Sequence, residues 1–199
     1  MRYLFAVLAL SMTVGLCWFL DHSRTAAVPF GPGRVLDPFN GVWQNMEGED
    51  FKLSENMDLP GLQAPVKVHY DARKVPHIFA ENDHDLYYMQ GYVTARDRLW
   101  QMEFQIFSAS GRISELIDNP RAVELDRMRR RTGMVKAAED ALAHISKDAE
   151  MMQTLDAYTE GVNAWVNDLG YSDLPMEYKL LDYSPENWSN LKTMLLLKL

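Results

Sequence analysis

Histidines, serines and carboxylates are the side chains of this 199-residue chain that could act as nucleophiles, bases or metal ligands. A hydrolase-type serine triad needs Gly-x-Ser-x-Gly, and the segment Ser108-Ala109-Ser110-Gly111 lacks the first glycine. A zinc site needs paired spacing such as His-Glu-x-x-His, which none of the five histidines has. They are His22, His69, His77, His84 and His144. We therefore interpret them as structural and predict no metal site.

The carboxylates give no acid and base pair either. Asp97 and Glu103 are six residues apart, which on a helix places them on different faces. Asp83 and Asp85 lie near a predicted helix start, where acidic residues cap the helix and complement its dipole. The segment Gly31-Pro32-Gly33 lies outside any strand-to-helix turn and predicts no phosphate loop. The residues alone therefore assign no catalytic, cofactor-binding or metal-binding position.

Four charges interrupt the apolar segment 91–104. They are Arg96, Asp97, Arg98 and Glu103. The segment has a helical pattern with two apolar faces, which predicts burial inside a larger body. Buried charges are costly unless each finds a partner. We expect these four to form a hydrogen-bonded ionic network with one another or with a neighbouring segment, and such a network can hold a nearby site rigid.

The elements that must position these residues follow from apolar periodicity. Residues 66–70 and 75–80 alternate apolar and polar side chains and predict two strands joined by a turn. A long helix is predicted from Asn82 or Asp83 to Ser110-Gly111. Further helical segments are expected at 112–117, from 118–122 onward, at 135–144, at 147–167 and from about 189. The lead-in is rich in Pro and Gly and is expected to be irregular, pinned by Phe30, Phe39, Trp43 and Leu62.

The first 27 residues read as an export segment. Residues 3–20 carry no charge and are mostly apolar, between Arg2 and Asp21. This length fits either a signal peptide, with a weak cleavage site at Thr25-Ala26-Ala27, or a retained membrane anchor, and the sequence leaves both open. The single cysteine, Cys17, lies inside the segment. Without it the chain has no disulfide and no catalytic thiol.

Composition bounds the remaining chain. We divide the sequence into the export segment 1–27, the irregular lead-in 28–64 and one folded region at 65–199. Hydrophobic residues make up 47% and charged residues 24%, which is typical of a globular protein. The formal charge of −8 argues against a nucleic-acid partner. The basic run at 126–131 is expected to be a solvated or internally paired helix face.

The sequence stops inside an apolar helical pattern at 191–199. It lacks the glycine, proline or polar tail with which helices commonly end. The last carbonyls and the leucine face of such a helix need partners. We therefore expect a fragment of a longer protein, in which the isolated chain exposes residues 195–199 and aggregates.

Residues 65–199 resemble the start of the alpha chain of penicillin acylases, which are N-terminal-nucleophile (Ntn) hydrolases. Many motifs occur in the family's order and at plausible spacing. They are Val66-x-Val68, Asp71, Val75-Pro76-His77-Ile78-x-Ala80, Asp85-Leu86, Gly91-Tyr92-Val93-x-Ala95-x-Asp97-Arg98-Leu99-Trp100-Gln101-Met102-Glu103, Gly111-Arg112-Ile113-Ser114-Glu115, Asp126, Arg130-Arg131, Gly133, Ala157-Tyr158-x-x-Gly161-Val162-Asn163-Ala164-Trp165, Leu174-Pro175-x-Glu177 and Tyr183-Ser184-Pro185-x-x-Trp188.

The resemblance implies an α+β fold. The chain would be the mostly helical alpha-chain portion, with two short N-terminal strands, of a four-layer αββα sandwich. It implies an exported precursor, periplasmic or membrane-anchored, that cuts itself and hydrolyses small linear amides. The serine freed at the start of the beta chain is the nucleophile, with its own amino group as base. The helix at 91–104 would be a strut whose charges pair with that beta-chain portion.

The resemblance carries no site residue onto this chain. The nucleophile, the oxyanion-hole groups, the acyl pocket and the ligands of the calcium that some members bind all fall outside it. The fragment alone is therefore expected to be inactive. Two other readings stay open: a non-catalytic exported helical domain that binds a partner or ligand through its aromatic faces, and a truncated remnant of an enzyme.

Overall fold

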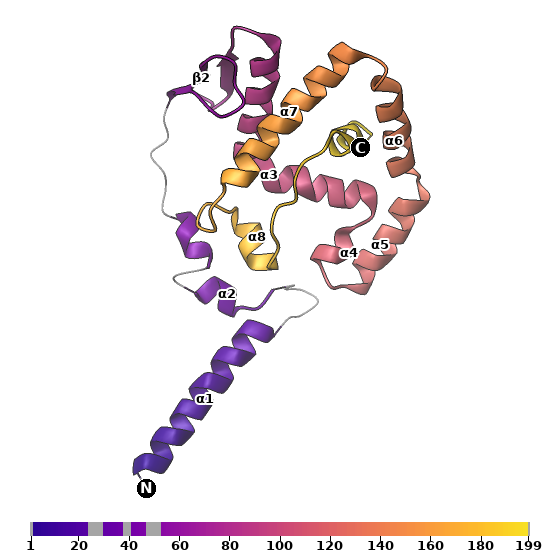
Figure 1. Cartoon of the computed structure of the whole chain (residues 1–199). Helices are drawn as coiled ribbons and strands as arrows, with labels where there is room; N and C mark the ends of the chain where they lie inside the picture. The colour runs from indigo at the N-terminus through magenta and orange to yellow at the C-terminus, as the bar shows by residue number, and fades with distance from the viewer. Residues whose placement is uncertain (1, 24–29, 38–40, 47–52, 199) are drawn as a thin grey trace.

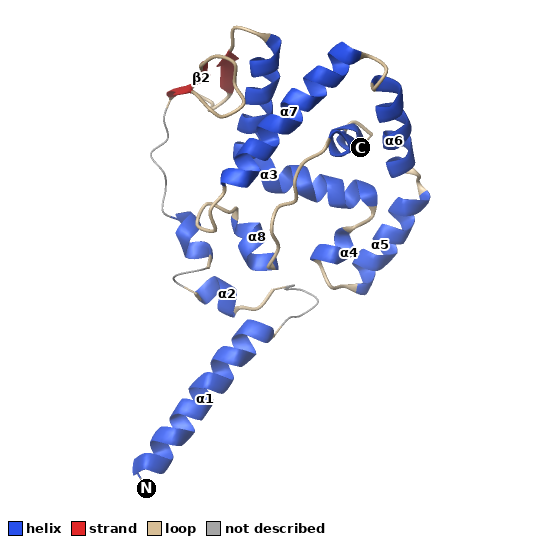
Figure 2. Ribbon diagram, in the orientation of Figure 1, coloured by secondary structure: helices blue, strands red, loops and turns tan. Residues whose placement is uncertain are grey.

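The structure is a computed structural model of the chain, and it describes residues 2–23, 30–37, 41–46 and 53–198. Its α-helices are α1 (Arg2–His22), α2 (Gly33–Leu36), α3 (Asp83–Ser110), α4 (Ile113–Leu116), α5 (Pro120–Arg131), α6 (Met134–Ile145), α7 (Ala149–Asp168), α8 (Met176–Leu181) and α9 (Asn190–Leu196). A 3₁₀ helix, η1 (Val42–Met46), and three strands, β1 (Ser54–Met57), β2 (Val66–Tyr70) and β3 (Pro76–Phe79), complete the described elements. Helices dominate beside one small sheet (Figures 1 and 2), which confirms the predicted α+β class.

The sheet is antiparallel with the order β1-β2-β3. β2 alternates as predicted, because Val66, Val68 and Tyr70 are buried against α3 while the residues between them are exposed. At the turn, the Asp71 carboxylate accepts hydrogen bonds from two backbone N–H groups of the following residues. The prediction of two strands was incomplete. β1 was missed because its sequence, Ser-Glu-Asn-Met, does not alternate apolar and polar residues. It is a strand because its backbone pairs with β2.

Helix α3 begins and ends where the sequence predicted. The Asn82 side chain accepts a hydrogen bond from the Asp85 N–H at 2.8 Å, which caps the first turn. Gly111 ends the helix with φ of 69°, a left-handed conformation that glycine adopts without a Cβ penalty. Between these ends α3 bends at Arg98, whose φ and ψ are −145° and 23°. The bend divides α3 into the two arms visible in Figure 1.

The first arm of α3 crosses α7 at very short range through two glycines. A Cβ added at Gly91 would collide with the backbone carbonyl of Tyr158, and one added at Gly161 would collide with that of Tyr88. Each helix therefore presents a glycine to the backbone of the other. This crossing separates two parts of the core, one between α3 and the sheet and the other among α3, α6, α7 and α9.

Three expectations about the ends of the folded region need correction. Trp43 was expected to pin the lead-in but is 48% exposed. Phe39 lies outside the described residues, whereas Leu62 packs on the sheet core as predicted. Leu195 was expected to be exposed, yet it is buried in the core cluster that α6 and α9 share, and Leu197 alone of the described terminal leucines is largely exposed. Helix α8 was not predicted, because it is only six residues long and follows directly on the break in the helical pattern at Leu174-Pro175.

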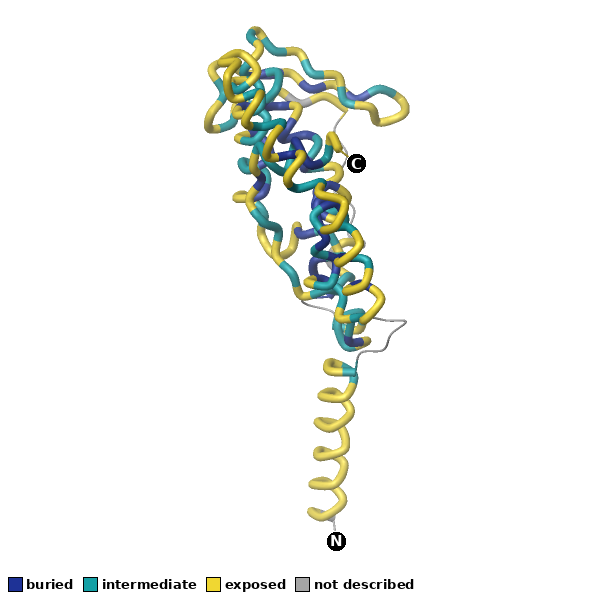
Figure 3. Tube along the Cα trace, turned by 90° about the vertical axis from the view of Figure 1, so that its right-hand side faces the viewer, coloured by how far each residue is buried: buried dark blue, intermediate teal, exposed yellow. Residues whose placement is uncertain are grey.

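Helix α1 extends away from the rest of the molecule. Figure 3 shows it exposed over nearly its whole length. An 18-residue stretch within residues 3–22 has a mean hydropathy of 2.0 and none of it is buried, so the helix is long and apolar enough to cross a membrane. This fits the predicted export segment. The weak cleavage site at 25–27 lies outside the described residues.

Candidate functional site

Glu103 is the centre of a buried polar cluster that joins several helices. Its side chain is 1% exposed and lies on the second arm of α3. One carboxylate oxygen accepts a hydrogen bond from the Tyr178 hydroxyl at 2.7 Å, and the other accepts from the Glu186 N–H at 2.8 Å. The Lys192 ammonium lies 3.8 Å away. Glu103 therefore joins α3, α8, the loop at 183–189 and α9, and we call this set the Glu103 hub.

Burial dominates the ionisation of Glu103. Removal from water favours the neutral acid and raises the pKa of Glu103 above its ordinary value. The hydrogen bonds from Tyr178 and from the Glu186 backbone, and the charge of Lys192, oppose this rise without cancelling it. Aromatic rings complete the low-dielectric surroundings, with Trp100 packed edge-on against Tyr178 at 5.2 Å. A side chain so enclosed holds the helices together and offers no surface to a substrate.

Arg112 forms the outer layer of the hub. Its guanidinium pairs with Glu186 at 2.6 Å and with Glu115 at 2.7 Å, and it lies over the Phe107 ring at 4.6 Å. The hydrogen bond from Arg112 is the largest influence on Glu186, and with Lys192 it lowers the pKa of Glu186 to about 2. This carboxylate is therefore charged wherever the protein is folded near neutral pH.

Asp126 fastens the turn that leads from α3 into α4. It is buried, and its two oxygens accept hydrogen bonds from the Ile113 N–H at 2.8 Å and the Ser114 N–H at 2.7 Å. Arg130, one turn along α5, donates to the Gly111 carbonyl at 2.9 Å. The basic run thus has a structural inner side, while Arg127 on its outer side pairs with an exposed glutamate. This confirms the prediction of a solvated and internally paired helix face.

The predicted four-charge network does not form as one unit. Only Glu103 is buried, and the bend at Arg98 leaves Asp97 and Arg98 exposed on the surface. Arg96 forms a hydrogen bond to the Tyr70 hydroxyl and lies near Asp97, which separates this pair from Glu103. Helical periodicity could not reveal the bend, because it assumes that all four residues belong to one straight helix. The partners of Glu103 lie in neighbouring segments of this chain, which was one of the two predicted alternatives, and pairing of the other helix charges with the beta-chain portion stays a prediction.

The bend instead opens the surface beside the sheet. A groove of about 510 Å³ lies between the β2–β3 hairpin and α3, lined in part by Lys74, Val75, Asp97 and Arg98. A smaller hollow of about 220 Å³ lies on the other side of the bend, next to Glu177. Both sides of the bend are therefore accessible to another chain segment.

Asp85 has a larger role than the predicted helix cap. Its side chain is fully buried, and its oxygens accept hydrogen bonds from the Gln63 N–H and the Ala64 N–H, both at 2.9 Å. Burial acts to raise its pKa, but these bonds and those from His84 and Asn82 outweigh burial and hold the pKa of Asp85 below its ordinary value. Asp85 therefore fastens the end of the lead-in to α3. No local pattern could have revealed the contact, because it joins residues more than twenty positions apart.

The largest of the described cavities lies beside the α3–α7 crossing, next to the loop at 59–61. It measures about 540 Å³ and is lined mainly by residues of the 59–61 loop and of α3 and α7, among them Tyr88, Tyr92, Glu160 and Asn163. Some of its polar groups are already used. The Tyr88 hydroxyl donates to the Pro60 carbonyl, and the Asn163 side chain forms two hydrogen bonds with the Trp188 backbone. Glu160 and the end of α7 remain as an acidic rim.

The histidines and acids do not gather into a metal site. Among the described residues, no three His, Cys, Asp or Glu side chains lie together in a way that could hold a metal ion. His69 and His77 face each other across β2 and β3, and His84 lies against Asp85 and Glu160.

The chain is similar in sequence to several acylases. Penicillin acylase 2 proenzyme from Pseudomonas sp. (strain SE83) is 40% identical over 136 residues, which cover 68% of this chain and 17% of that protein. Penicillin G acylase from Escherichia coli is 32% identical over 62% of this chain and 14% of its own length. The acyl-homoserine lactone acylase QuiP from Pseudomonas aeruginosa is 34% identical over 65% of this chain and 15% of its length. The chain thus spans about one sixth of these relatives.

A solved structure agrees with the sequence relatives. The thermostable penicillin G acylase from Alcaligenes faecalis superposes with a TM-score of 0.58 and 29% identity, covering 66% of this chain and 69% of that chain. The fold is therefore that of the helical portion of an Ntn-hydrolase, as predicted. The sequence model of the penicillin amidase family matches residues 65–199. The match begins just before β2 and leaves out α1, the lead-in and β1. This chain belongs to the penicillin amidase family.

Proposed function

We propose that this chain is the N-terminal portion of an exported, self-processing precursor that hydrolyses linear amides into an acyl group and an amine. The observation that carries the proposal is the family match over residues 65–199. The share of about one sixth that the chain covers in its relatives supports a longer precursor. The name of one relative as a proenzyme supports processing, and the apolar helix α1 supports export to the periplasm.

In this proposal the chain is a scaffold for the catalytic portion. No described residue combines a nucleophile with a base in an accessible site, and the Glu103 carboxylate is closed off by its own partners. The nucleophilic serine, the oxyanion hole and any calcium ligands belong to the beta-chain portion or to chain beyond Leu199. The exposed bend of α3, with Asp97 and Arg98, is a surface that this portion can contact.

The names of the relatives suggest two substrate classes. Two are named penicillin acylases and one is named an acyl-homoserine lactone acylase, so the substrate in this proposal is a penicillin or an acyl-homoserine lactone. Both are small molecules with a linear amide. The acyl pocket decides between them, and we place it outside residues 1–199.

The test is to express the complete reading frame that contains residues 1–199. We expect two chains by mass spectrometry and release of amine from a chromogenic phenylacetyl amide or from an acyl-homoserine lactone. The matched control replaces the serine at the processing junction with alanine, which should leave one uncut and inactive chain. Turnover by that variant, or by residues 1–199 alone, would refute the proposal that the nucleophile lies outside residues 1–199.

The cavity of about 540 Å³ supports a second candidate, a binding domain without catalysis. Its tyrosine walls and acidic rim suit a small aromatic amine. Binding of such an amine to residues 1–199, lost in Tyr92→Ala and retained in Tyr3→Ala on the exposed helix α1, would favour this candidate. An uncut, inactive product of the complete reading frame would favour it further.

A further inference from the structure

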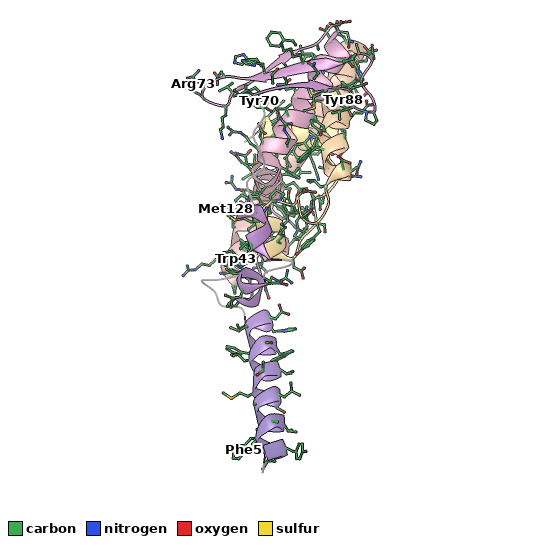
Figure 4. The ribbon with its side chains drawn as sticks, turned by 90° about the vertical axis from the view of Figure 1, so that its left-hand side faces the viewer. Phe5, Trp43, Tyr70, Arg73, Tyr88 and Met128 are labelled. Carbon is green, nitrogen blue, oxygen red and sulfur yellow. The ribbon has the colours of Figure 1, made fainter. Side chains whose placement is uncertain are left out.

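Exposed apolar side chains gather at the end of the folded region from which α1 departs. Leu36 on α2 is 60% exposed, Trp43 on η1 is 48% exposed, Tyr171 before α8 is 50% exposed and Met176 at the start of α8 is 49% exposed. We call these four residues the apolar corner. Figure 4 places Trp43 at the end of the folded region nearest α1, and Figure 1 shows α2 and α8 there as well.

The corner is held rigidly by polar contacts behind it. Arg34 on α2 pairs with Asp182 at 2.7 Å and donates to the Lys179 carbonyl at 3.0 Å. The Asn45 side chain donates to the Leu174 carbonyl and accepts from the Lys179 ammonium, which joins η1 to α8. Because these cations are engaged with neighbouring groups, the surface of the corner is apolar and aromatic rather than basic.

The corner is also fixed to the end of α1. A Cβ added at Gly31 would collide with the Asp21 carbonyl, and one added at Gly33 would lie 3.2 Å from the Asp21 Cα. The segment that leads into α2 therefore packs directly on the last turn of α1. When α1 stays attached to the chain, this contact therefore holds the apolar corner beside the end of α1.

A membrane around α1 would reach the apolar corner. A helix of this length and hydropathy spans the hydrocarbon core, and Arg2 at its start favours a cytoplasmic N-terminus with the folded region outside. Trp and Tyr accumulate at the boundary between hydrocarbon and headgroups, where an apolar ring and a polar edge are both satisfied. Exposed apolar side chains gathered beside an anchor are a feature that marks such a contact.

We propose that α1 is a retained membrane anchor and that the apolar corner rests in the headgroup region of the same bilayer. The enzyme would then lie on the membrane in a fixed orientation, with α8 and η1 toward the lipid and the start of α7 pointing away from it. This proposal does not depend on the proposed amidase activity, because it concerns α1 and the surface next to it.

The test uses one fluorescent label at a time on the full chain in lipid vesicles. Cys17→Ser removes the native thiol, and Met176→Cys then places an environment-sensitive dye in the apolar corner. Met151→Cys is the matched control, since Met151 is a methionine of equal exposure, 50%, at the start of α7 on the side away from α1. The vesicles contain phosphatidylethanolamine and phosphatidylcholine, with or without a nitroxide-labelled lipid.

We expect the dye at position 176 to shift to shorter emission wavelength and to lose most of its intensity to the nitroxide lipid, while the dye at 151 does neither. Intact mass of the chain recovered from cell membranes should include α1. Equal behaviour of the two labels would overturn the proposal, as would a mass that lacks α1. A shift at 176 without quenching in the complete precursor would also overturn it, and would assign the corner to a protein contact.

Discussion

The two arms of α3 are held in place by different means. The first arm, before Arg98, approaches α7 through Gly91 and Gly161 so closely that no Cβ fits, and its polar anchor, Asp85, accepts backbone N–H groups. The second arm is anchored by Glu103, which accepts one hydroxyl and one backbone N–H. One helix therefore contains a backbone-packed half and a carboxylate-centred half.

The two anchors show how two carboxylates with almost no exposed surface can differ in ionisation. Burial acts on both to raise the pKa. At Asp85 the donors outweigh burial and the pKa falls, whereas at Glu103 they do not and the pKa rises. The first arm should thus gain stability from ionisation of its acid, whereas burial makes ionisation of the acid in the second arm less favourable than in water.

The largest effect is expected where the helices touch through backbone. Gly161→Ala should gain about 1 kcal/mol of helix propensity. It should nevertheless lose about 3 kcal/mol net, because the Cβ meets a backbone carbonyl that cannot rotate away. In a chain of this size that loss lowers the melting temperature by roughly 6–12 °C, measured by circular dichroism in detergent micelles.

The matched control for this substitution is Gly170→Ala. Its nearest neighbour is the side chain of Asp173, which can move aside, so the melting temperature should change little. Equal effects of the two substitutions would contradict the close crossing. Gly91→Ala should repeat the loss from the opposite side.

Removing the anchor of the first arm should have the next largest effect. Asp85→Ala leaves two backbone N–H groups without their acceptor, and each unsatisfied buried donor costs about 1–3 kcal/mol. We expect a net loss of about 2 kcal/mol at pH 7. Since the pKa of Asp85 is lowered in the folded state, its contribution is present above its ordinary value and is lost as the pH falls through the lower folded value.

Asp83→Ala is the control for Asp85, because both are acids in the first turn of α3 and both affect its dipole equally. Asp83 is exposed, so its removal should cost only a few tenths of a kcal/mol. If the two variants unfold at the same temperature, Asp85 is only a helix-dipole residue, as the sequence first suggested.

Local rules predicted β2, β3, both ends of α3 and most helices after it, because strand alternation and caps such as Asn82 and Gly111 are properties of a few adjacent residues. The family motifs predicted the penicillin amidase fold. The positions of the partners of Glu103 could not be predicted, because Tyr178 and Glu186 lie 75 and 83 residues away and α8 was not recognised. The bend at Arg98 could not be predicted either, because no proline or glycine, the usual sequence signals of a kink, lies at that position.

The second arm should respond to pH in the opposite sense from the first. The pKa of Glu103 is raised, so the folded state binds its proton more tightly than the unfolded state does. Its contribution to stability is therefore fully present below the ordinary pKa and is lost as the pH rises through the folded value. Glu103→Gln should remove this loss. The free energy of unfolding of the variant should therefore rise relative to that of the native chain as the pH rises above 4.5. Thermal unfolding from pH 4 to 8 measures the difference.

Glu139→Gln serves as the control, because this glutamate is exposed on α6 outside the hub. Its difference from the native chain should stay constant over the same range. A constant difference for Glu103→Gln as well would mean that the hub donors compensate burial at Glu103 as fully as they do at Asp85, and the contrast between the two arms would disappear.

The smallest effect is expected at the outer layer of the second arm. Arg112→Lys keeps the charge but loses the planar fork that reaches Glu115 and Glu186 together, so we expect a loss of about 1 kcal/mol. Because both partners are partly exposed, salt should reduce this difference. Arg127→Lys, at an exposed pair on α5, should change nothing measurable. If Arg112→Lys matched Arg127→Lys, the hub would end at Lys192, and the second arm would depend on Glu103 and its hydroxyl and amide donors alone.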